Sequence, residues 1–557
     1  MIRELDQAGR EELGPYDVCV VGSGPAGVTV VAELAGSGLA LALLESGRLA
    51  PTSRGDELRK VESEGIAIKD SSRERVLGGA STTWAGLASP LDEVDLEPRP
   101  FLRAPAWPIA RAELMQLYAE ASARYRFPAP ALFAPGGFDA LRAKGDLAPQ
   151  WQHLEEKVFL AAAEPQDFGR EQRSVLDGPA VETWLDATVL RLEHESGTAR
   201  VRCALVRSSS GRGVRVRART FVLATGGIEN ARLLLASHDM CAAGLGNEHD
   251  QVGRWLMNHP KSYRGVVHFA RPMRDLPYYF GCLHKGYAGY AGLRLSVAEQ
   301  RRRGLLDSYV RLEPLFPWTD SRGVEALVLA VKRSRKLFSA WKRKREDEVV
   351  PLRDWSETGD DSALESERGR KLSYLALAGL VAADLPRVAR YAWHRVRGRS
   401  EPLVPRARVR NFMEMEPDPG NRVTLSEARD AHGVRVPHVR HRCTDLDRRS
   451  LVALHEELAR ELERTGLGWL ESDLATADPW PVDQDASHHM GTTRMGTDPA
   501  TSVVDPDLRL HTVENVWLAG ASVFPTSGCA NPTLTIVALS IRLARHLRRE
   551  LSAEGRA

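Results

Sequence analysis

Two adjacent histidines near the C-terminal end, His488 and His489, are candidates for proton chemistry. They stand in ASHHMGTTRMG (486–496), before a run of small and polar residues that favours a turn over a plain helix or strand. A neutral imidazole accepts protons near neutral pH, so either could be a general base. Asn531, in SGCANPTLT (527–535), carries a side-chain amide that could hydrogen-bond a ligand. Taken alone, each has a plainer interpretation: a polar turn for the histidines and a helix cap for Asn531.

The N-terminal stretch YDVCVVGSGPAGVTVVAELAGSGLALALLESG (16–47) predicts a nucleotide-binding unit. Its pattern is GxGxxG, flanked by an expected strand (17–21), helix (25–36) and second strand (39–45). Gly22 permits a tight turn, Gly24 lets the backbone approach a pyrophosphate, and Gly27 lets the helix pack closely on the strand. Pro25 and Ala26 open the helix, whose N-terminal N–H groups would face the phosphates.

Glu45 ends the second expected strand. There its carboxylate could accept both hydroxyls of an adenosine ribose, and it would repel a 2′-phosphate. This disfavours NADP but leaves FAD and NAD open.

Four later segments could complete a flavin site. VLGGASTTWAGLASP (76–90) is a second cluster of glycines and hydroxyls, WLDATVLRLEHE (184–195) suits a strand near an adenine, and RTFVLATGGIENARLLLAS (219–237) reads as strand, turn and helix. NVWLAGAS (515–522) is a strand running into a small-residue turn before the helix at Asn531. The cofactor contacts expected from them are Gly79, Ala80, Ser81, Thr82, Val189, Ala224, Gly226, Gly520, Ala521, Asn531, Pro532 and Thr533.

Composition limits the class of protein. The chain has 557 residues, which suggests two lobes, and its net charge of +2 gives no indication of nucleic-acid binding. Its six cysteines are scattered without metal-ligand spacing, so we expect reduced thiols and no metal. The charged N-terminus lacks the apolar core of a signal peptide, and the apolar run 374–385 is too short to span a bilayer. We therefore expect a cytoplasmic protein with no transmembrane segment.

The order of motifs predicts an α/β fold in two interleaved parts. A Rossmann-like FAD-binding domain should comprise 1–96, 181–256 and 481–557, and an α+β substrate domain with a sheet roofing the flavin should comprise 97–180 and 257–480. Residues 320–402 form a charged helical insertion in the second part. Its basic stretch 328–346 could touch a membrane surface, although a hairpin with a solvated charged face is the favoured interpretation.

Taken together, the motifs GSGPAG with Glu45, GGAST (78–82), ATGG (224–227), HHMGTTRMG (488–496) and GCANPTLT (528–535) resemble the glucose–methanol–choline (GMC) family of FAD oxidoreductases. The resemblance is strongest to the branch of pyranose oxidases and bacterial sugar and glycoside oxidoreductases, which pair a histidine with an asparagine. The family pattern H-x-x-G implies that His488 is the base, with His489 as the alternative. It also implies that Asn531 is its partner.

Two departures from this branch bear on the cofactor and the substrate. Thr83 stands where pyranose oxidases carry a histidine bonded to the flavin, which implies non-covalent FAD. Glu414 and Met415 replace a Glu-Gln pair of such relatives, so a polar contact to substrate is expected to be missing.

The resemblance implies oxidation of a CH–OH group of a sugar, glycoside or related polyol, with hydride passing to flavin N5. A biosynthetic dehydrogenase acting on an aminoglycoside or another glycosylated natural product fits the same motifs, and a sterol or aliphatic alcohol fits them less well. A GMC-fold lyase or a binding protein with structural FAD is the alternative from another class. The motifs do not distinguish oxygen from a quinone or another carrier as the electron acceptor.

Overall fold

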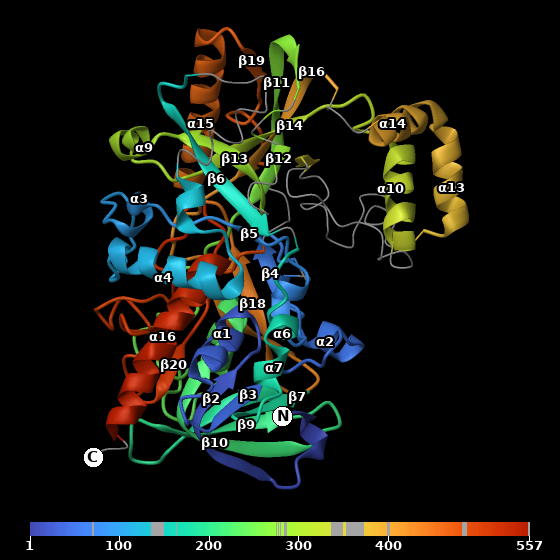
Figure 1. The fold of residues 1–557 in the computed structure, drawn as a ribbon. Coiled ribbons are helices and arrows are strands. Elements are labelled where there is room, and N and C mark those ends of the chain that lie inside the picture. The colour runs from blue at the N-terminus through green and yellow to red at the C-terminus, as the bar shows by residue number, and fades with distance from the viewer. Residues whose placement is uncertain are drawn as a thin grey trace.

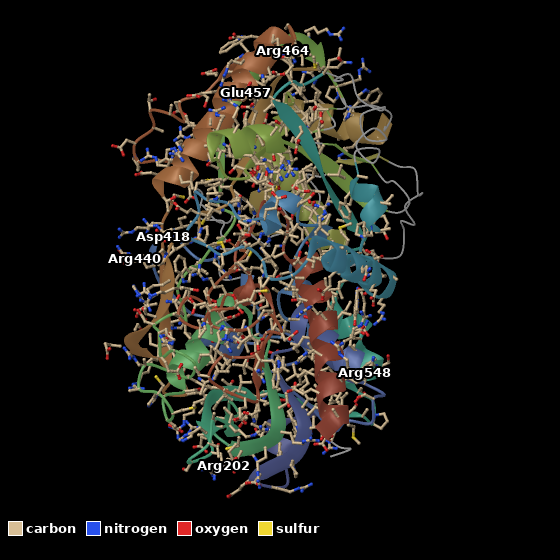
Figure 2. All side chains as sticks on the ribbon, turned by 90° about the vertical axis from the view of Figure 1, so that its left-hand side faces the viewer. Arg202, Asp418, Arg440, Glu457, Arg464 and Arg548 are labelled. Atoms are coloured by element: carbon tan, nitrogen blue, oxygen red, sulfur yellow. The ribbon has the colours of Figure 1, made fainter. Side chains whose placement is uncertain are left out.

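The computed structural model describes the chain except for residues 70–71, 135–149, 163, 275, 277, 279, 283–286, 336–348, 352–371, 398–401, 482–486 and 555–557. Figure 1 shows an elongated body with one sheet at each end. Figure 2 marks the two ends, with Glu457 and Arg464 at one and Arg202 at the other.

The first sheet is built around the glycine-rich N-terminal unit. Its strands run in the order β1 (Ile2–Glu4), β7 (Val181–Leu185), β3 (Leu41–Leu44), β2 (Glu12–Val21), β10 (Gly213–Leu223), β9 (Val201–Arg207) and β8 (Thr188–His194), and β20 (Val516–Leu518) also pairs with β10. All neighbours are parallel except at the β8–β9–β10 edge. The unit β2–α1–β3, with α1 at Pro25–Leu34, confirms the expected strand, helix and strand with boundaries shifted by a few residues. This is the α/β architecture expected from the motif order.

Helices from distant parts of the chain pack beside α1. The contacts of α1 with α16 (Thr533–Glu554), and of α16 with α4 (Arg111–Tyr125), place the C-terminal helix between the two. Helix α8 (Gly226–Ala236) follows β10 directly. Gly27 lets α1 lie close to the turn after β2, because a Cβ on Gly27 would lie 1.9 Å from the carbonyl oxygen of Gly22.

The second sheet is largely antiparallel. Its order is β19 (Gly468–Glu471), β11 (Lys261–Met273), β16 (Val404–Phe412), β14 (Tyr309–Pro314), β13 (Tyr287–Leu295), β6 (Leu154–Ala162) and β5 (Leu87–Ala88). Its own buried core includes the inner face of α15 (Asp445–Arg464), and α9 (Val297–Arg303) lies beyond β13. Strands β11, β13, β14 and β16 lie in residues 257–480, where a sheet of the second part was expected.

The two cores do not follow the order of the chain. A small sheet of β17 (Arg422–Arg429), β18 (Arg435–His441) and β4 (Glu62–Gly65) contributes Val423 and Val439 to the core of the first sheet. Helix α4 contributes Leu117 and Tyr118 to that same core. Two segments distant in sequence from the nucleotide motifs therefore support the nucleotide sheet.

The remaining elements are short. They are α2 (Ser53–Leu58), α3 (Glu93–Leu96), α6 (Phe168–Glu171), α7 (Arg173–Leu176), the pair β12 (Phe280–Cys282) and β15 (Val349–Pro351), and 3₁₀ turns at Leu5–Gln7, Gly79–Thr82, Pro130–Phe133 and Ala521–Val523. The five cysteines whose side chains are described, Cys19, Cys203, Cys241, Cys443 and Cys529, are free thiols.

The predicted insertion contains α10 (Arg322–Arg335), α13 (Tyr374–Ala383) and α14 (Leu385–Arg397), which stand out from the body in Figure 1. Trp318 anchors α14 through ring contacts with Tyr391 and His394. Of the basic stretch 328–346, the part beyond Arg335 lies outside the described residues. In the part of the chain that the structure describes, every helix is too short or too polar to cross a membrane.

Candidate active site

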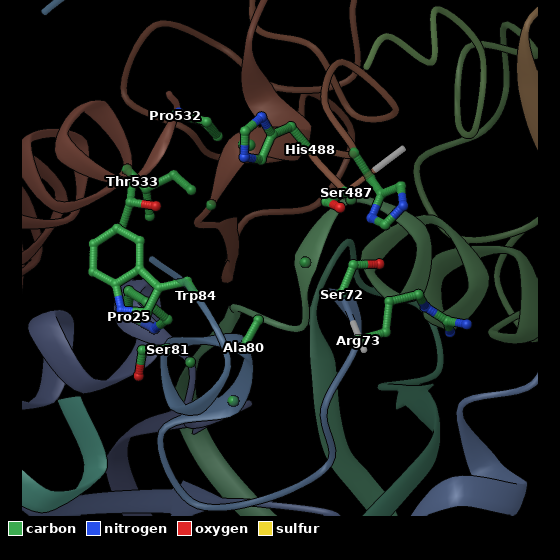
Figure 3. Close-up of a pocket in the computed structure, with 18 of the residues that line it drawn as sticks. Pro25, Ser72, Arg73, Ala80, Ser81, Trp84, Ser487, His488, Pro532 and Thr533 are labelled. Atoms are coloured by element: carbon green, nitrogen blue, oxygen red, sulfur yellow. The ribbon is translucent and has the colours of Figure 1, made fainter. Parts of the chain in front are cut away.

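A cavity of about 440 Å³ opens between the two sheets. Its walls come from the β2–α1 turn, the 76–90 segment, the start of α8, strands β11, β13, β14 and β16, and the segments around His488 and Asn531. In Figure 3, His488, Pro532 and Thr533 project into it from one side, and Pro25, Ala80 and Ser81 from the other. A volume of this size suits a small molecule.

The structure brings most of the expected cofactor residues to this cavity. Those that line it are Gly22, Gly24, Pro25, Ala26, Glu45, Gly79, Ala80, Ser81, Val189, Ala224, Gly226, Gly520, Ala521, Asn531, Pro532 and Thr533. Gly27 and Thr82 do not line the cavity. Gly27 lies where α1 approaches the turn after β2, and the Thr82 hydroxyl donates a hydrogen bond to the carbonyl oxygen of Gly79 at 2.9 Å.

The turn between β2 and α1 has the shape that a phosphate group requires. Gly22 has φ +98°, in the left-handed region, and a Cβ on Gly24 would meet nothing within 4 Å. Gly79 approaches Gly24 so closely that a Cβ on Gly79 would lie 3.0 Å from the Gly24 Cα. The backbone N–H groups at the start of α1 therefore face open space, where a dinucleotide pyrophosphate fits.

Glu45 lies in this wall and is buried. Its Oε2 accepts hydrogen bonds from the Ser23 hydroxyl at 2.6 Å and backbone N–H at 3.1 Å, and its Oε1 accepts one from the Gly47 N–H at 2.7 Å. These bonds fix the carboxylate at the cavity edge. Carboxylate oxygens have further lone pairs, so ribose hydroxyls can still donate to it.

Two histidines that contact each other at this cavity, His259 and His488, come from distant segments of the chain. Met257 and Met490 exchange backbone hydrogen bonds of 3.0 Å in each direction, which brings His259 beside His488. The Asn258 side-chain oxygen accepts the backbone N–H of His259 at 3.0 Å and of His488 at 2.7 Å. The two rings meet edge to face, with their Nδ1 atoms 3.0 Å apart.

The hydrogen bonds of His259 determine the proton positions on both rings. Burial lowers the pKa of His259 to about 4, so its ring is neutral at pH 7. Its Nε2 lies 2.9 Å from the carbonyl oxygen of Gly528, which can only accept, so Nε2 carries the proton and Nδ1 has none. The Nδ1 of His488 must then donate to His259, which leaves the proton-accepting lone pair of neutral His488 on Nε2.

A buried ion pair holds the peptide that orients His259. The Gly528 N–H donates to Glu414 Oε1 at 3.2 Å, and Arg99 binds both oxygens of Glu414, at 2.9 and 2.6 Å. The backbone N–H of Asp307 adds a third donor at 2.6 Å. Burial acts to raise the pKa of Glu414, but the charge and hydrogen bonds of Arg99 outweigh it and lower the pKa. Glu414 therefore positions the site from behind and does not line the cavity.

Gly528 has φ +52°, and a Cβ there would lie 2.6 Å from the buried carboxylate of Asp95. Asp95 belongs to an acidic cluster with Asp92 and Asp307. Arg294 pairs with Asp92 at 2.6 Å and with Asp307 at 2.7 Å. Burial is the main cause that raises the pKa of Asp95, to about 7. These groups form a compact layer of charge behind the histidines.

His489 occupies a different environment from His488. Its side chain is buried against Gly227, and its Nε2 has no hydrogen-bond partner. Burial is the main cause that lowers its pKa to about 3, with the Arg73 charge contributing. A ring so hard to protonate is a poor proton acceptor near neutral pH. Of the two candidate bases, the environment favours His488.

Sequence reasoning missed Asn258, His259 and the Arg99–Glu414 pair. The segment MNHPK carries no motif, and His259 lies 229 residues from its partner His488. The helix at Asn531 also differs from expectation, because α16 begins two residues later at Thr533. Asn531 therefore precedes the helix and lines the cavity.

Comparisons with known proteins agree with this geometry. Residues 417–540 match the GMC oxidoreductase family model. The 6'''-hydroxyparomomycin C oxidase of Streptomyces lividus is 25% identical over 99% of this chain and 95% of its own length. The fructose dehydrogenase large subunit of Gluconobacter japonicus is 26% identical over 60% of this chain, and the match spans 48% of that subunit. A variant of Aspergillus oryzae RIB40 formate oxidase, studied for its FAD modification, shares the fold with a TM-score of 0.53 at 16% identity, covering 97% of this chain and 99% of that one.

The resemblance to GMC oxidoreductases that the five sequence motifs indicated is confirmed, and these relatives support an FAD-dependent alcohol oxidoreductase. The second histidine of the motif, His489, is buried without a hydrogen-bond partner on Nε2, and His488 instead contacts His259, which lies two residues before β11.

Replacing His489 with glutamine should change how stability depends on pH. A histidine whose folded pKa is about 3 and whose unfolded pKa is about 6.5 stabilises the fold above pH 6.5 and loses that contribution on acidification. From pH 6.5 to 5 the wild type should therefore lose roughly 2 kcal/mol more than His489→Gln in urea unfolding. The exposed His249→Gln gives the background. A difference between wild type and His489→Gln that stays constant over this range would contradict a buried neutral His489.

Proposed function

We propose that this protein oxidises a CH–OH group of a sugar, glycoside or related polyol, with His488 as the base. The observation that carries the proposal is the hydrogen-bonded pair of His259 and His488 at the cavity wall. When both rings are neutral, Nε2 of His488 accepts a proton while its Nδ1–H donates to His259. That is what removal of a hydroxyl proton requires.

The proton step follows from the same geometry. The substrate hydroxyl gives its proton to Nε2 of His488, and the resulting imidazolium keeps its Nδ1–H bonded to His259. His259 therefore accepts the same hydrogen bond before and after the transfer and needs no rearrangement. Asn531, in the same cavity, hydrogen-bonds the hydroxyl oxygen and orients the carbon that loses hydride.

FAD, when bound, supplies the hydride acceptor. The turn at Gly22–Gly27 would hold its pyrophosphate, and Glu45 its adenosine ribose. Thr83 lines the cavity where the resembling pyranose oxidases link flavin covalently, and its side-chain hydroxyl is a poor nucleophile. We therefore propose that FAD is held without a covalent bond.

The names of the relatives support a sugar-like substrate. One relative is a fructose dehydrogenase subunit and the other a hydroxyparomomycin oxidase. Both have substrates rich in hydroxyl groups, so the proposal favours a polyhydroxylated substrate over a sterol or aliphatic alcohol.

Anaerobic bleaching of the purified yellow protein tests the function directly. A sugar, glycoside or polyol should bleach the flavin, and sterols should not. In His488→Ala the rate constant for flavin reduction should fall by about 10²–10⁴-fold, since a general base contributes that much. His268→Gln, on the far part of β11 and stacked on Trp469, is the matched histidine control. If dithionite bleaches the flavin but no alcohol does, a lyase or a binding protein with structural FAD becomes the better interpretation.

Variants of His259 test whether it positions the base. In His259→Leu no acceptor remains for the Nδ1–H of His488, so flavin reduction should slow by about 10²-fold with little change in substrate affinity. His259→Asn places an amide oxygen near the lost acceptor and should recover much of that rate. The pH profile of reduction should shift in the leucine variant and return towards wild type in the asparagine variant. Equal losses in both variants would indicate a merely structural histidine.

A further inference from the structure

The second sheet presents a positively charged face to the same cavity. The register of β11, β16 and β14 places Lys261 opposite Phe412 and Tyr309 opposite Phe412 in one row. The next row holds Tyr263, Arg410 and Arg311, each directly opposite its neighbour. Directly opposed residues share one face of a sheet, so these side chains stand together.

Five of these side chains line the cavity, Lys261, Tyr309, Arg311, Arg410 and Phe412, and Tyr290 of β13 lines it as well. The cations pack on the rings: Arg311 lies 5.2 Å from the centre of Tyr290, Arg410 lies 5.3 Å from that of Phe412, and Lys261 lies 6.0 Å from that of Phe412. Such contacts hold a guanidinium in place while leaving its edge N–H groups to bind other partners. The rings also give a flat apolar surface beside the charges.

One carboxylate on this face, that of Glu313, forms ion pairs with three arginines. Glu313 contacts Arg311 closely, and Arg408 and Arg410 each approach it at 3.4 Å. Burial acts to raise the pKa of Glu313, but the three guanidinium groups outweigh it and lower the pKa to about 2. Glu313 is therefore ionised and contributes a single negative charge. Of the described side chains on β11, β14 and β16 that share this face, it is the one carboxylate.

Arg410 has guanidinium hydrogen-bond donors that its neighbours leave unsatisfied. Its side chain is 8% exposed, its Nη1 makes only the long contact to Glu313, and its Nε has no hydrogen-bond partner. A buried guanidinium donor left unbonded is costly, and an anion entering the cavity would remove that cost. Arginine suits a carboxylate or phosphate because its N–H groups form a rigid fork.

We infer that the substrate carries an anionic group, a carboxylate or a phosphate on the sugar, which binds at Arg410 and Arg311. The inference rests on the proposed oxidation of a sugar-like alcohol and narrows its substrate class. Such a group would bind on the β14–β16 face while the reacting hydroxyl lies at His488 and Asn531 in the same cavity. A polycationic aminoglycoside would meet like charge on that face, which disfavours it as the substrate.

The test compares sugars that differ only in charge. Anaerobic flavin reduction of the holoenzyme is measured with glucose, glucuronate, glucose 6-phosphate and glucosamine. The carboxylate or the phosphate sugar should be favoured over glucose by about tenfold or more in reduction rate constant divided by dissociation constant, with glucosamine the poorest. The two anionic sugars show which acidic group the site takes. If glucose and glucosamine reduce the flavin as well as both anionic sugars, the inference falls and the oxidase or dehydrogenase proposal stands.

Variants locate the anion site. Arg410→Met should remove most of the preference for the anionic sugar, lowering its value about tenfold, and Arg410→Lys should recover part of it. Arg408→Met is the matched control, because Arg408 also approaches Glu313 but does not line the cavity. Equal effects of the two methionine variants would show a structural role and overturn the inference. If Arg410→Met lowers this value equally for neutral and anionic sugars, the positive charge of Arg410 serves the cofactor and the inference is also overturned.

Inorganic phosphate provides a readout that needs no turnover. Titrated into the holoenzyme and followed by the flavin absorbance spectrum, it should bind about tenfold more weakly to Arg410→Met than to wild type or Arg408→Met. This holds even if no sugar in the panel bleaches the flavin, in which case the proposed function fails separately. Identical phosphate binding by all three proteins, or none by wild type, would contradict an anion site.

Discussion

The 3.0 Å contact between the Nδ1 atoms of His259 and His488 is the interaction on which the site depends. Two neutral imidazoles can share such a contact only if one nitrogen donates and the other accepts. The carbonyl of Gly528 settles the choice, because it forces the proton of His259 onto Nε2. A backbone oxygen thus determines which nitrogen of a second residue is available for chemistry. The geometry of His259 therefore sets which nitrogen of neutral His488 carries the proton.

One buried ion pair keeps this geometry in place. Arg99 and Glu414 fix the Gly528 peptide from behind, and both are buried, so removing one partner would leave the other charge uncompensated. On the β14–β16 face, Glu313 balances only part of the charge of three arginines. Arg99 and Glu414 neutralise each other away from the cavity, whereas Arg311 and Arg410 line it with charge that Glu313 only partly balances. The first pair supports the site, and the second group of side chains is suited to bind a ligand.

The sequence predicted the core of the first sheet well, because GxGxxG at Gly22–Gly27 is a local pattern whose spacing follows from one turn and one helix. Most of the cofactor residues that it named line the cavity. It also brought His488 and Asn531 forward through local motifs. It could not predict His259, since that residue reaches the site only through a two-residue bridge between Met257 and Met490. The same limit applies to Glu414, because no local motif indicates that it is the buried partner of Arg99. The pairing of Arg311 with Arg410 depends on strand register, which the sequence does not show.

The most direct test of this account is the protonation state of the His488 ring, observed by ¹⁵N NMR on the holoenzyme with labelled histidine. His488→Gln identifies its signals among those of the 16 histidines. At a pH where the ring is neutral, the account predicts a protonated Nδ1 and an unprotonated Nε2 for His488, and the reverse for His259. If the proton of neutral His488 is found on Nε2, His259 does not prepare the base, and the proposed proton transfer is wrong.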